Sequence, residues 1–319
     1  MYRNLALVIL LLIINCHRPQ IETHNFVIVG ECKLPGYAKD VDVKGDYAYI
    51  ANDQGGLQIV DISNPESPFI VGSYISQKSY QGVAVRDSFA YVAVAASDGG
   101  VAIFNVHNPD SIILLGQDPS FYAYRIIAPE GDSQYIYIAA RYWFIVEDVT
   151  WPQYPSFIRR FATPGNVHSL FVVDSMVYLA CEQMGLIIYN LNHPDSTAKI
   201  GEIDTPSNAR DIFVWANKAY IADGYGGLVI IDVSEPDNLE LLGSYDTPGY
   251  AQGIFVEDNL AYIADGSEGL KVFDISDSQS PQLYGMLKTP YAYNIYVRDK
   301  QIYLVDRDLG LVIIEEENR

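Results

Sequence analysis

Cysteine is scarce in this sequence of 319 residues, which contains only Cys16, Cys32 and Cys181. Secreted domains held together by disulfides carry more cysteines, at close and regular spacings. No two of these cysteines have the spacing of a metal-binding pair. We therefore expect neither a disulfide framework nor a cysteine-ligated metal, and we expect Cys32 and Cys181 to be small packed residues.

Positive charge is also scarce, with 20 Lys and Arg against 40 Asp and Glu and a net charge of −20. Nucleic-acid-binding proteins present a basic surface to the phosphate backbone, and an acidic surface repels both phosphates and anionic lipid headgroups. We therefore expect no nucleic-acid partner. Contact with a membrane is expected only through an N-terminal lipid.

Long apolar runs are missing beyond the N-terminus, where Leu5 to Ile14 form an unbroken run of ten residues. Such a run is too short to cross a bilayer as a helix. Arg3 precedes it, and a short basic segment followed by an apolar run is typical of a secretory signal peptide. The sequence predicts a signal peptide over residues 1–15 and hence an exported protein.

The apolar run ends at Ile13-Ile14-Asn15-Cys16, which resembles a bacterial lipobox, with an aliphatic residue three positions before the acceptor cysteine. The resemblance implies cleavage before Cys16 and lipidation of its thiol, so that residues 16–25 are a lipidated cysteine and a short polar tether. It places the protein in the cell envelope, lipid-anchored to a membrane, with the outer membrane, a periplasmic face and the cell surface as the alternatives. An ordinary secretory signal with an unmodified cysteine is the alternative.

Catalytic motifs are the last absence. The sequence has no Gly-x-Ser-x-Gly turn, His-Glu-x-x-His pair, phosphate-binding loop or dinucleotide fingerprint. This favours a binding protein over an enzyme, and we predict no cofactor.

What the sequence does contain is a repeat. A Tyr-Ile-Ala tripeptide, with conservative variants, recurs at steps of 41 to 46 residues. Its tyrosines are Tyr49, Tyr91, Tyr137, Tyr178, Tyr220, Tyr262 and Tyr303. Each repeat contains four β-branched or aromatic runs separated by Gly, Pro, Asn and Asp, a pattern that predicts four short strands, A to D. Four strands in about 40 to 45 residues are typical of one β-propeller blade.

The two ends of the sequence fit together. The seventh repeat stops after its strand C, at Leu311 to Ile314, whereas the segment Phe26 to Gly30 matches the strand D of the first repeat, Phe69 to Gly72. We therefore predict an all-β fold over residues 26–319, a seven-bladed β-propeller of four-stranded blades in which the N-terminal strand closes the last blade. The repeated tyrosines are interpreted as packing between blades.

The strand C block Leu228-Val229-Ile230-Ile231-Asp232 and its copies, followed by Ser-x-Pro in the first and fifth repeats, resemble the LVIVD repeat. That family occurs in exported and cell-surface proteins of bacteria and archaea. The resemblance covers nearly the whole mature chain and implies a propeller, but it implies no particular activity.

In a propeller, the D–A and B–C loops lie on one face around the axis, and residues there that break the repeat are the informative ones. The sequence predicts that Asp211 lies near Asp223, across one hairpin. The carboxylates of Asp223, Asp265 and Asp306 are candidates for a calcium site, since Ca²⁺ prefers oxygen ligands. The alternative is that Asp is simply favoured in these turns.

The third repeat departs most from the others in these loops, where it places aromatic rings beside two arginines. Such amphipathic patches recognise sugars, carboxylates or protein side chains. The candidate ligand-binding residues are Tyr122, Tyr124, Arg125, Arg141, Tyr142 and Trp143. The alternative is that these rings fill space while the arginines pair with acidic neighbours.

The sequence thus favours a cell-envelope scaffold that binds an envelope or extracellular protein or glycan through the D–A/B–C face. The alternative function is a hydrolase or lyase with an axial acid–base site. Its candidate catalytic residues are His168, Asp211 and Asp223, because a histidine beside carboxylates can transfer protons. A structural envelope protein that serves only as a spacer is a third reading.

Overall fold

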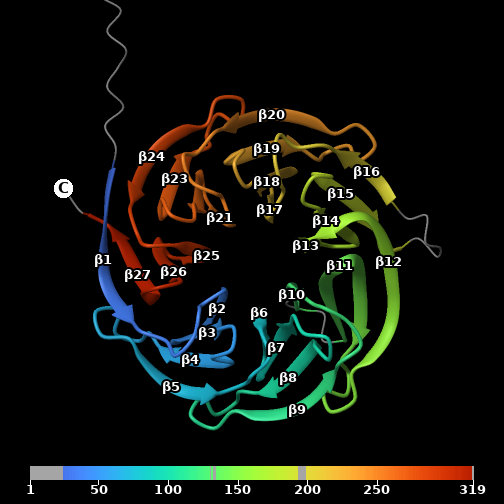
Figure 1. Ribbon diagram of the computed structural model, residues 1–319. Helices are drawn as coiled ribbons and strands as arrows, with labels where there is room; N and C mark the ends of the chain where they lie inside the picture. The colour runs from blue at the N-terminus through green and yellow to red at the C-terminus, as the bar shows by residue number, and fades with distance from the viewer. Residues whose placement is uncertain (1–23, 130, 132–133, 193–198, 318–319) are drawn as a thin grey trace, which may run out of the picture.

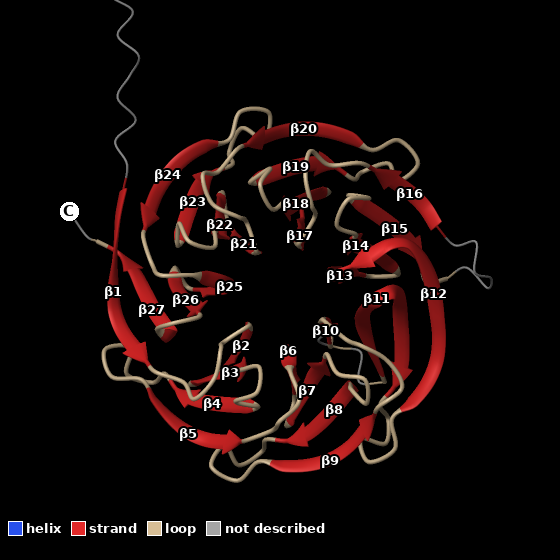
Figure 2. Cartoon of the chain, viewed as in Figure 1, coloured by secondary structure: helices blue, strands red, loops and turns tan. Residues whose placement is uncertain are grey.

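The computed structural model describes residues 24–129, 131, 134–192 and 199–317, and every regular element in these ranges is a β-strand. Figures 1 and 2 show the strands in radial sheets that surround a central axis. The predicted signal peptide and Cys16 lie outside the described residues. Strand β1 begins at His24, two residues before the predicted start of the folded domain.

Four positions recur from the axis outward. The innermost strands are β2 (Asp40–Lys44), β6 (Tyr80–Arg86), β10 (Arg125–Ile127), β13 (Ser169–Val173), β17 (Asp211–Trp215), β21 (Gly253–Glu257) and β25 (Ala292–Arg298). The next are β3 (Tyr47–Ala51), β7 (Phe89–Val94), β14 (Met176–Ala180), β18 (Lys218–Ala222), β22 (Leu260–Ala264) and β26 (Gln301–Asp306). The third are β4 (Leu57–Asp61), β8 (Gly100–Asn105), β15 (Leu186–Asn190), β19 (Leu228–Asp232), β23 (Leu270–Asp274) and β27 (Gly310–Glu316). The outermost are β1 (His24–Cys32), β5 (Phe69–Tyr74), β9 (Ile113–Asp118), β12 (Ser156–Val167), β16 (Lys199–Ile203), β20 (Glu240–Tyr245) and β24 (Gln282–Leu287). One further strand, β11 (Tyr135–Asp148), lies between β10 and β12.

These strands form four four-stranded sheets, one three-stranded sheet and one eight-stranded sheet. The eight-stranded sheet is two antiparallel ladders of four strands, joined where β1 meets β24 at only two residue pairs. By contrast, β1 pairs with β27 antiparallel along most of its length. The N-terminal strand therefore lies beside the C-terminal strand, as the match between Phe26–Gly30 and the outer strand of the repeat predicts.

The three-stranded sheet corrects the prediction of four separate strands in every repeat. Strand β11 spans both the predicted strand B and the predicted strand C. Fully extended, 14 residues span about 45 Å, yet the backbone N–H of Val149, just after the strand, donates to the carbonyl of Gln134, just before it, at 2.7 Å. The strand therefore folds back on itself, and Arg141 sits at the reversal with φ of 49°. The Gly-Gly turn of other repeats is missing here, so the predicted strands B and C are continuous in β11.

The hydrophobic core lies between neighbouring sheets. Tyr49 is 5% exposed and packs against Val83 and Val92 of the next sheet, and Tyr303 packs against Val41 of the first sheet. The other five repeated tyrosines are likewise buried in clusters that combine two sheets. This confirms the interpretation of the tyrosines as inter-sheet packing residues. Cys32 and Cys181 are buried free cysteines.

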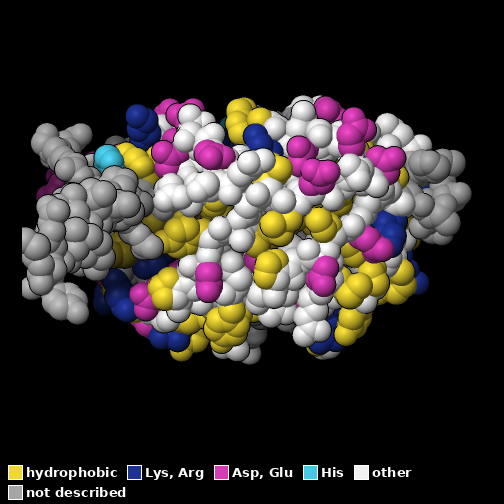
Figure 3. All heavy atoms as spheres, turned by 90° about the horizontal axis from the view of Figure 1, so that it is seen from above, with side chains coloured by type: hydrophobic (Ala, Val, Ile, Leu, Met, Phe, Trp, Pro, Cys, Tyr) yellow, Lys and Arg dark blue, Asp and Glu magenta, His cyan; other side chains and the backbone are white. Residues whose placement is uncertain are grey.

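Acidic side chains lie on the side of the ring that Figure 3 shows. Figure 3 views the ring edge-on and shows Asp and Glu side chains scattered among apolar and neutral ones. In the part of the chain that the structure describes, no helix is long and apolar enough to cross a membrane.

Candidate functional site

A polar pocket of about 250 Å³ lies on the axis, at the ends of the innermost strands where the D–A loops enter them. We call it the axial cup. Its lining consists of one residue from each of the seven innermost strands or the loops before them, together with Arg125, Ser169, Asp211, Tyr291 and Asn294. The seven residues at equivalent positions are Lys39, Gln81, Tyr124, His168, Arg210, Gln252 and Tyr293.

The Tyr-Ile-Ala repeat fixes the backbone of these cup residues. The backbone N–H of Lys39 donates to the carbonyl of Ala51, the last residue of the first tripeptide, at 2.8 Å. His168 and Arg210 make the same bond to the alanines of their own repeats, at 2.9 and 2.8 Å. A repeated backbone bond therefore presents a different side chain to the axis in each repeat. The repeat therefore sets the backbone of the cup, and the varying residue at this position sets which polar groups line it.

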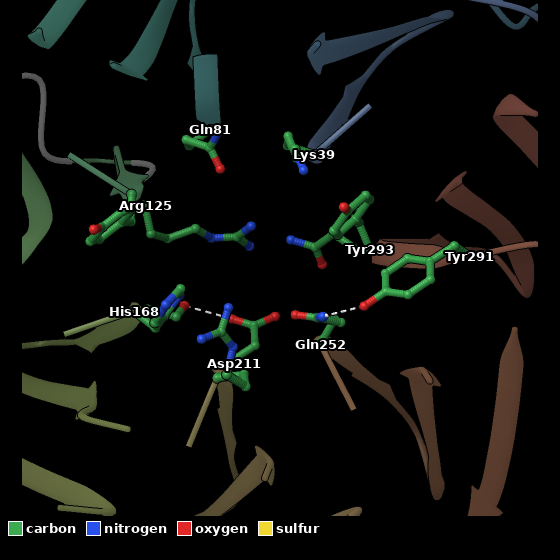
Figure 4. Close-up of a pocket in the computed structure, with 12 residues that line it drawn as sticks. Lys39, Gln81, Arg125, His168, Asp211, Gln252, Tyr291 and Tyr293 are labelled. Carbon is green, nitrogen blue, oxygen red and sulfur yellow. Dashed lines mark hydrogen bonds between the residues drawn. The ribbon is translucent and has the colours of Figure 1, made fainter. Parts of the chain in front are cut away.

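The floor of the cup is a belt of hydrogen bonds that joins distant sheets. Asp40 is 1% exposed and accepts hydrogen bonds from Arg125 Nη1, from Asn294 Nδ2 at 2.7 Å and from the backbone N–H of Val83 at 2.9 Å. Burial raises the pKa of Asp40 to about 6, and the positive charge of Arg125 limits this rise. In Figure 4 the side chain of Arg125 extends towards the axis from the β10 side.

A second carboxylate of the floor, Asp211, is held in the same manner. It accepts a hydrogen bond from Ser169 Oγ at 2.5 Å and another from the backbone N–H of Ile254 at 3.0 Å. Both Asp40 and Asp211 therefore bridge neighbouring sheets. Their hydrogen bonds link the innermost strands of neighbouring sheets around the axis.

One side of the cup is a cluster around Glu182. Its Oε1 lies 3.1 Å from His168 Nε2 and 3.3 Å from Arg210 Nη1. Asn166 Nδ2 donates to the same oxygen at 3.0 Å. Burial lowers the pKa of His168, which keeps its imidazole neutral near pH 7 despite the adjacent carboxylate. The ring of Tyr124 stacks on His168 with centroids 5.1 Å apart.

The opposite side of the cup is aromatic. The rings of Tyr291 and Tyr293 lie 5.0 Å apart, and Lys39 Nζ sits 3.7 Å from the centroid of Tyr293. Gln252 Nε2 donates to the hydroxyl of Tyr291 at 3.1 Å. The lining of the cup thus combines amide, ammonium and guanidinium donors with aromatic rings on two sides.

The carboxylates predicted as calcium ligands lie elsewhere and serve the loops. Asp223 is fully buried and accepts hydrogen bonds from Thr205 Oγ1 at 2.6 Å and from the backbone N–H of Ser207 at 2.8 Å. Asp265 repeats this arrangement with Thr247 and Gly249. Asp306 accepts backbone N–H groups, including that of Tyr291. Among the described residues no group of three or more His, Cys, Asp or Glu side chains is placed to hold a metal ion.

The hairpin register places Asp211 beside Asp223. Asp211 pairs with Ala222, so Asp223 is the next residue along the chain. Its carboxylate nevertheless turns to the D–A loop, whereas that of Asp211 turns to the neighbouring sheets. The predicted proximity therefore holds for the backbone, while the two carboxylates bind different partners. Of the three candidate catalytic residues, the structure brings His168 and Asp211 to the cup and leaves Asp223 outside its lining.

The six candidate residues of the third repeat divide between two places. Tyr124 and Arg125 line the axial cup. Tyr122, Arg141, Tyr142 and Trp143 line a separate pocket of about 350 Å³, which we call the third-sheet groove. Arginines cover its rings, with Arg141 4.7 Å from the ring of Tyr122 and Arg160 4.4 Å from that of Trp143. The side chain of Arg141 donates a hydrogen bond to Tyr124, so the cup and the groove meet at this pair of residues.

Sequence reasoning missed most of the cup, namely Lys39, Gln81, Arg210, Gln252 and Tyr293. The signal was present one residue before the aligned start of each strand A. At that position seven repeats carry five different residue types, all of them polar, between strands that otherwise repeat. Variation at a repeated position, with polarity kept, shows that the repeat does not fix these side chains.

Radial antiparallel sheets around an axis, with a polar cup at its mouth, define a β-propeller repeat protein. The sequence matches the LVIVD repeat over residues 35–76, 79–117, 206–247 and 248–289, just over half of the chain. This protein belongs to the LVIVD repeat family.

Solved structures support the same fold. The WD40 β-propeller domain of Doa1 aligns with a TM-score of 0.73 at 11% identity, over 92% of this chain and 98% of that one. The computationally designed Ika8 protein aligns with a TM-score of 0.61 at 10% identity, over 89% and 99% of the two chains. At such identities the likeness concerns the fold alone. No curated protein matches the sequence.

Proposed function

We propose that this protein is an exported, lipid-anchored scaffold of the cell envelope that binds an envelope or extracellular protein or glycan at the axial cup. The observation that carries the proposal is the contrast at the cup. Strands that repeat around the ring present different polar side chains at their seven equivalent positions. A scaffold that served only as a spacer would have no need for this variation.

Within the proposal, the ring has seven four-stranded blades. The eight-stranded sheet counts as two blades, because β1 meets β24 at only two residue pairs. The three-stranded sheet counts as one, because β11 folds into a hairpin. This count agrees with the seven copies of the tyrosine tripeptide and with the seven cup positions.

The anchor is tested by changing Cys16 to Ser. A lipid on this thiol would hold the chain at a membrane without a spanning segment, so we expect wild type in the membrane fraction and Cys16→Ser in the soluble fraction. Cys32→Ala is the matched control, because Cys32 is buried within the ring, and it should stay with the membrane. Equal membrane retention of wild type and Cys16→Ser would overturn the anchor.

The binding site is tested by capture. The full-length chain in mild detergent serves as bait for envelope and extracellular extracts, beside Lys39→Gln/Arg210→Gln at the cup. A second variant, Tyr142→Ala, alters the third-sheet groove, where Tyr142 is 58% exposed. We expect the cup variant to lose the captured partner and the groove variant to keep it. Loss in the groove variant alone would move the site to the third sheet.

An axial hydrolase or lyase is the second candidate function. The observation that favours it is the neutral His168 beside Glu182 at the edge of the cup, since a neutral imidazole can accept a proton from a bound substrate. The change His168→Gln would then abolish turnover of a captured glycan or ester and leave its binding in place. Unchanged turnover in that variant would rule out His168 as the base.

A further inference from the structure

The seven equivalent cup positions differ in charge from the rest of the molecule. The chain has twice as many acidic as basic residues, yet none of the seven equivalent cup positions carries Asp or Glu. Two of them, Lys39 and Arg210, are cations, and Gln81 and Gln252 are amides. A ring protein that is acidic overall thus presents hydrogen-bond donors around its axis.

Lys39 is the cation that the protein itself leaves available. Arg125 is neutralised by Asp40, and Arg210 shares Glu182 with His168. Among the described residues, Lys39 Nζ has no carboxylate within 4.0 Å and lies instead over the ring of Tyr293. An ammonium group carries three donors, and a ring face supplies none of the oxygen acceptors that they require.

Other donors around the cup are also unsatisfied. The Nε atoms of Arg125 and Arg210 are buried and have no hydrogen-bond partner among the described residues. Buried polar groups without partners are costly, and a binding site is one place where such groups persist. Because these two Nε atoms are buried, a ligand in the cup meets Lys39 instead, and the ammonium of Lys39 favours a charged oxygen acceptor.

The rings and the size of the cup narrow the ligand further. The rings of Tyr291, Tyr293 and Tyr124 line the cup, and each has a partner on one face, namely Arg307, Lys39 and His168 respectively. The other ring faces can pack on an apolar surface. Amides and the carboxylate of Asp211 pair well with hydroxyl groups. The volume of about 250 Å³ falls below the range of about 300–1,000 Å³ of drug-sized ligand sites, which suits one small residue of a longer chain.

We propose that the axial cup binds the carboxylated sugar at the end of an acidic glycan, with Lys39 paired to the carboxylate. The tyrosine rings pack on the C–H face of the sugar, and Gln81, Gln252 and Asp211 bind its hydroxyl groups. A free peptide C-terminus would supply the carboxylate but neither the hydroxyl groups nor the ring-packing face. This inference rests on the proposed function, because it names the ligand of the same cup.

The test is calorimetric titration of the full-length chain with an oligosaccharide that ends in glucuronic acid. Its counterpart ending in glucose and a peptide with a free C-terminal carboxylate are titrated in parallel. We expect the acidic sugar to bind at least about tenfold more tightly than the neutral one, in line with a charge-assisted hydrogen bond. Equal affinities, or binding of the peptide alone, would overturn the inference.

Variants of Lys39 distinguish loss of its charge from damage to the fold. Lys39→Gln should weaken binding of the acidic sugar by about tenfold and bring it close to the neutral sugar, whereas Lys39→Arg should keep the preference. Lys33→Gln is the matched control, because Lys33 lies in the same D–A loop with its side chain 77% exposed, and it should change affinity less than about twofold. Equal losses in Lys39→Gln and Lys33→Gln would contradict the assignment.

The capture experiment distinguishes binding of a partner at the cup from binding of an acidic sugar there. Loss of the partner in the cup variant, together with no binding of the acidic sugar, would overturn this inference and leave the proposed function standing. Equal capture by the native chain and the cup variant would overturn the proposed function itself.

Discussion

At the scale of single residues, the most informative departures from the repeat are polar side chains in places where other repeats are apolar. Glu147 is the clearest case. It stands where equivalent strands bury Val60, Ile231 or Phe273, and it is itself fully buried. Neither carboxylate oxygen accepts a hydrogen bond from a described residue, and the side chain of Asp118 is its acidic neighbour. Burial, with the charge of Asp118 as a smaller cause, raises the pKa of Glu147 to about 9.

This raised pKa predicts a pH-dependent stability. The folded state keeps a proton on Glu147 that the unfolded chain releases above its usual pKa of 4.5, so the free energy of unfolding falls as pH rises from about 4.5 to 9. By pH 7 the cost is about 3 kcal/mol. Glu147→Gln removes the titration and should raise stability at pH 7 by roughly 2–3 kcal/mol.

Denaturant unfolding of wild type and Glu147→Gln at pH 5, 7 and 8.5 checks this expectation. The two stabilities should lie closest at pH 5 and diverge as pH rises. Parallel curves across this range would mean that Glu147 does not hold a proton in the fold.

At the scale of elements, the contact between neighbouring sheets depends on a glycine in the outermost strand. A Cβ atom placed at Gly72 of β5 would overlap the carbonyl oxygen of Pro109, in the turn of the next sheet. Gly30 meets Pro65 and Gly201 meets Pro236 in the same manner. The outer strand can therefore approach the next sheet only where it has no side chain.

We expect Gly72→Ala to destabilise the fold by about 1–3 kcal/mol, because the added methyl group forces the strand away from the Pro109 turn. Gly45→Asn is the comparison variant, since no atom lies within 4 Å of an added Cβ there and Asn tolerates the positive φ of 57°. Thermal unfolding of both variants measures the difference. A Gly72→Ala protein as stable as wild type would show that this close packing is dispensable.

The elements also show what the sequence could predict. The tripeptide at Tyr49 and its copies marks the second strand because apolar and turn residues alternate regularly around it. In the third repeat the same rule fails, because the loss of the Gly-Gly turn lets β11 run through Arg141 without a break. The cup was harder to predict, since Lys39, Arg210 and Tyr293 share a position but no residue type. Pattern recognition finds what repeats, and these residues do not.

At the scale of the whole molecule, the ring is closed by its first described strand. Phe26 of β1 is 6% exposed and packs with Tyr262 and Ile314, which belong to the two neighbouring ladders of the eight-stranded sheet. This side chain joins the beginning of the described chain to its end. Closure also removes the free edge that β27 would otherwise present.

Phe26→Ala should therefore cost about 3–5 kcal/mol, the range for a large buried aromatic side chain, and should lower the cooperativity of unfolding as the ring opens. Phe69→Ala on the outer strand β5 is the control, because Phe69 is 55% exposed. Calorimetry should give a much smaller change for Phe69→Ala. Similar losses in both variants would contradict a special role for the closing strand.

The central claim is that a ligand occupies the axial cup, and hydroxyl-radical footprinting of the full-length chain tests it most directly. The chain is oxidised with and without the captured partner, and modification is read by mass spectrometry at individual aromatic residues. Our account predicts that Tyr124 and Tyr293 become protected, whereas the groove residues Tyr142 and Trp143 stay as reactive as before. Protection of Tyr142 and Trp143 with no change at Tyr293 would contradict it and place recognition at the third sheet.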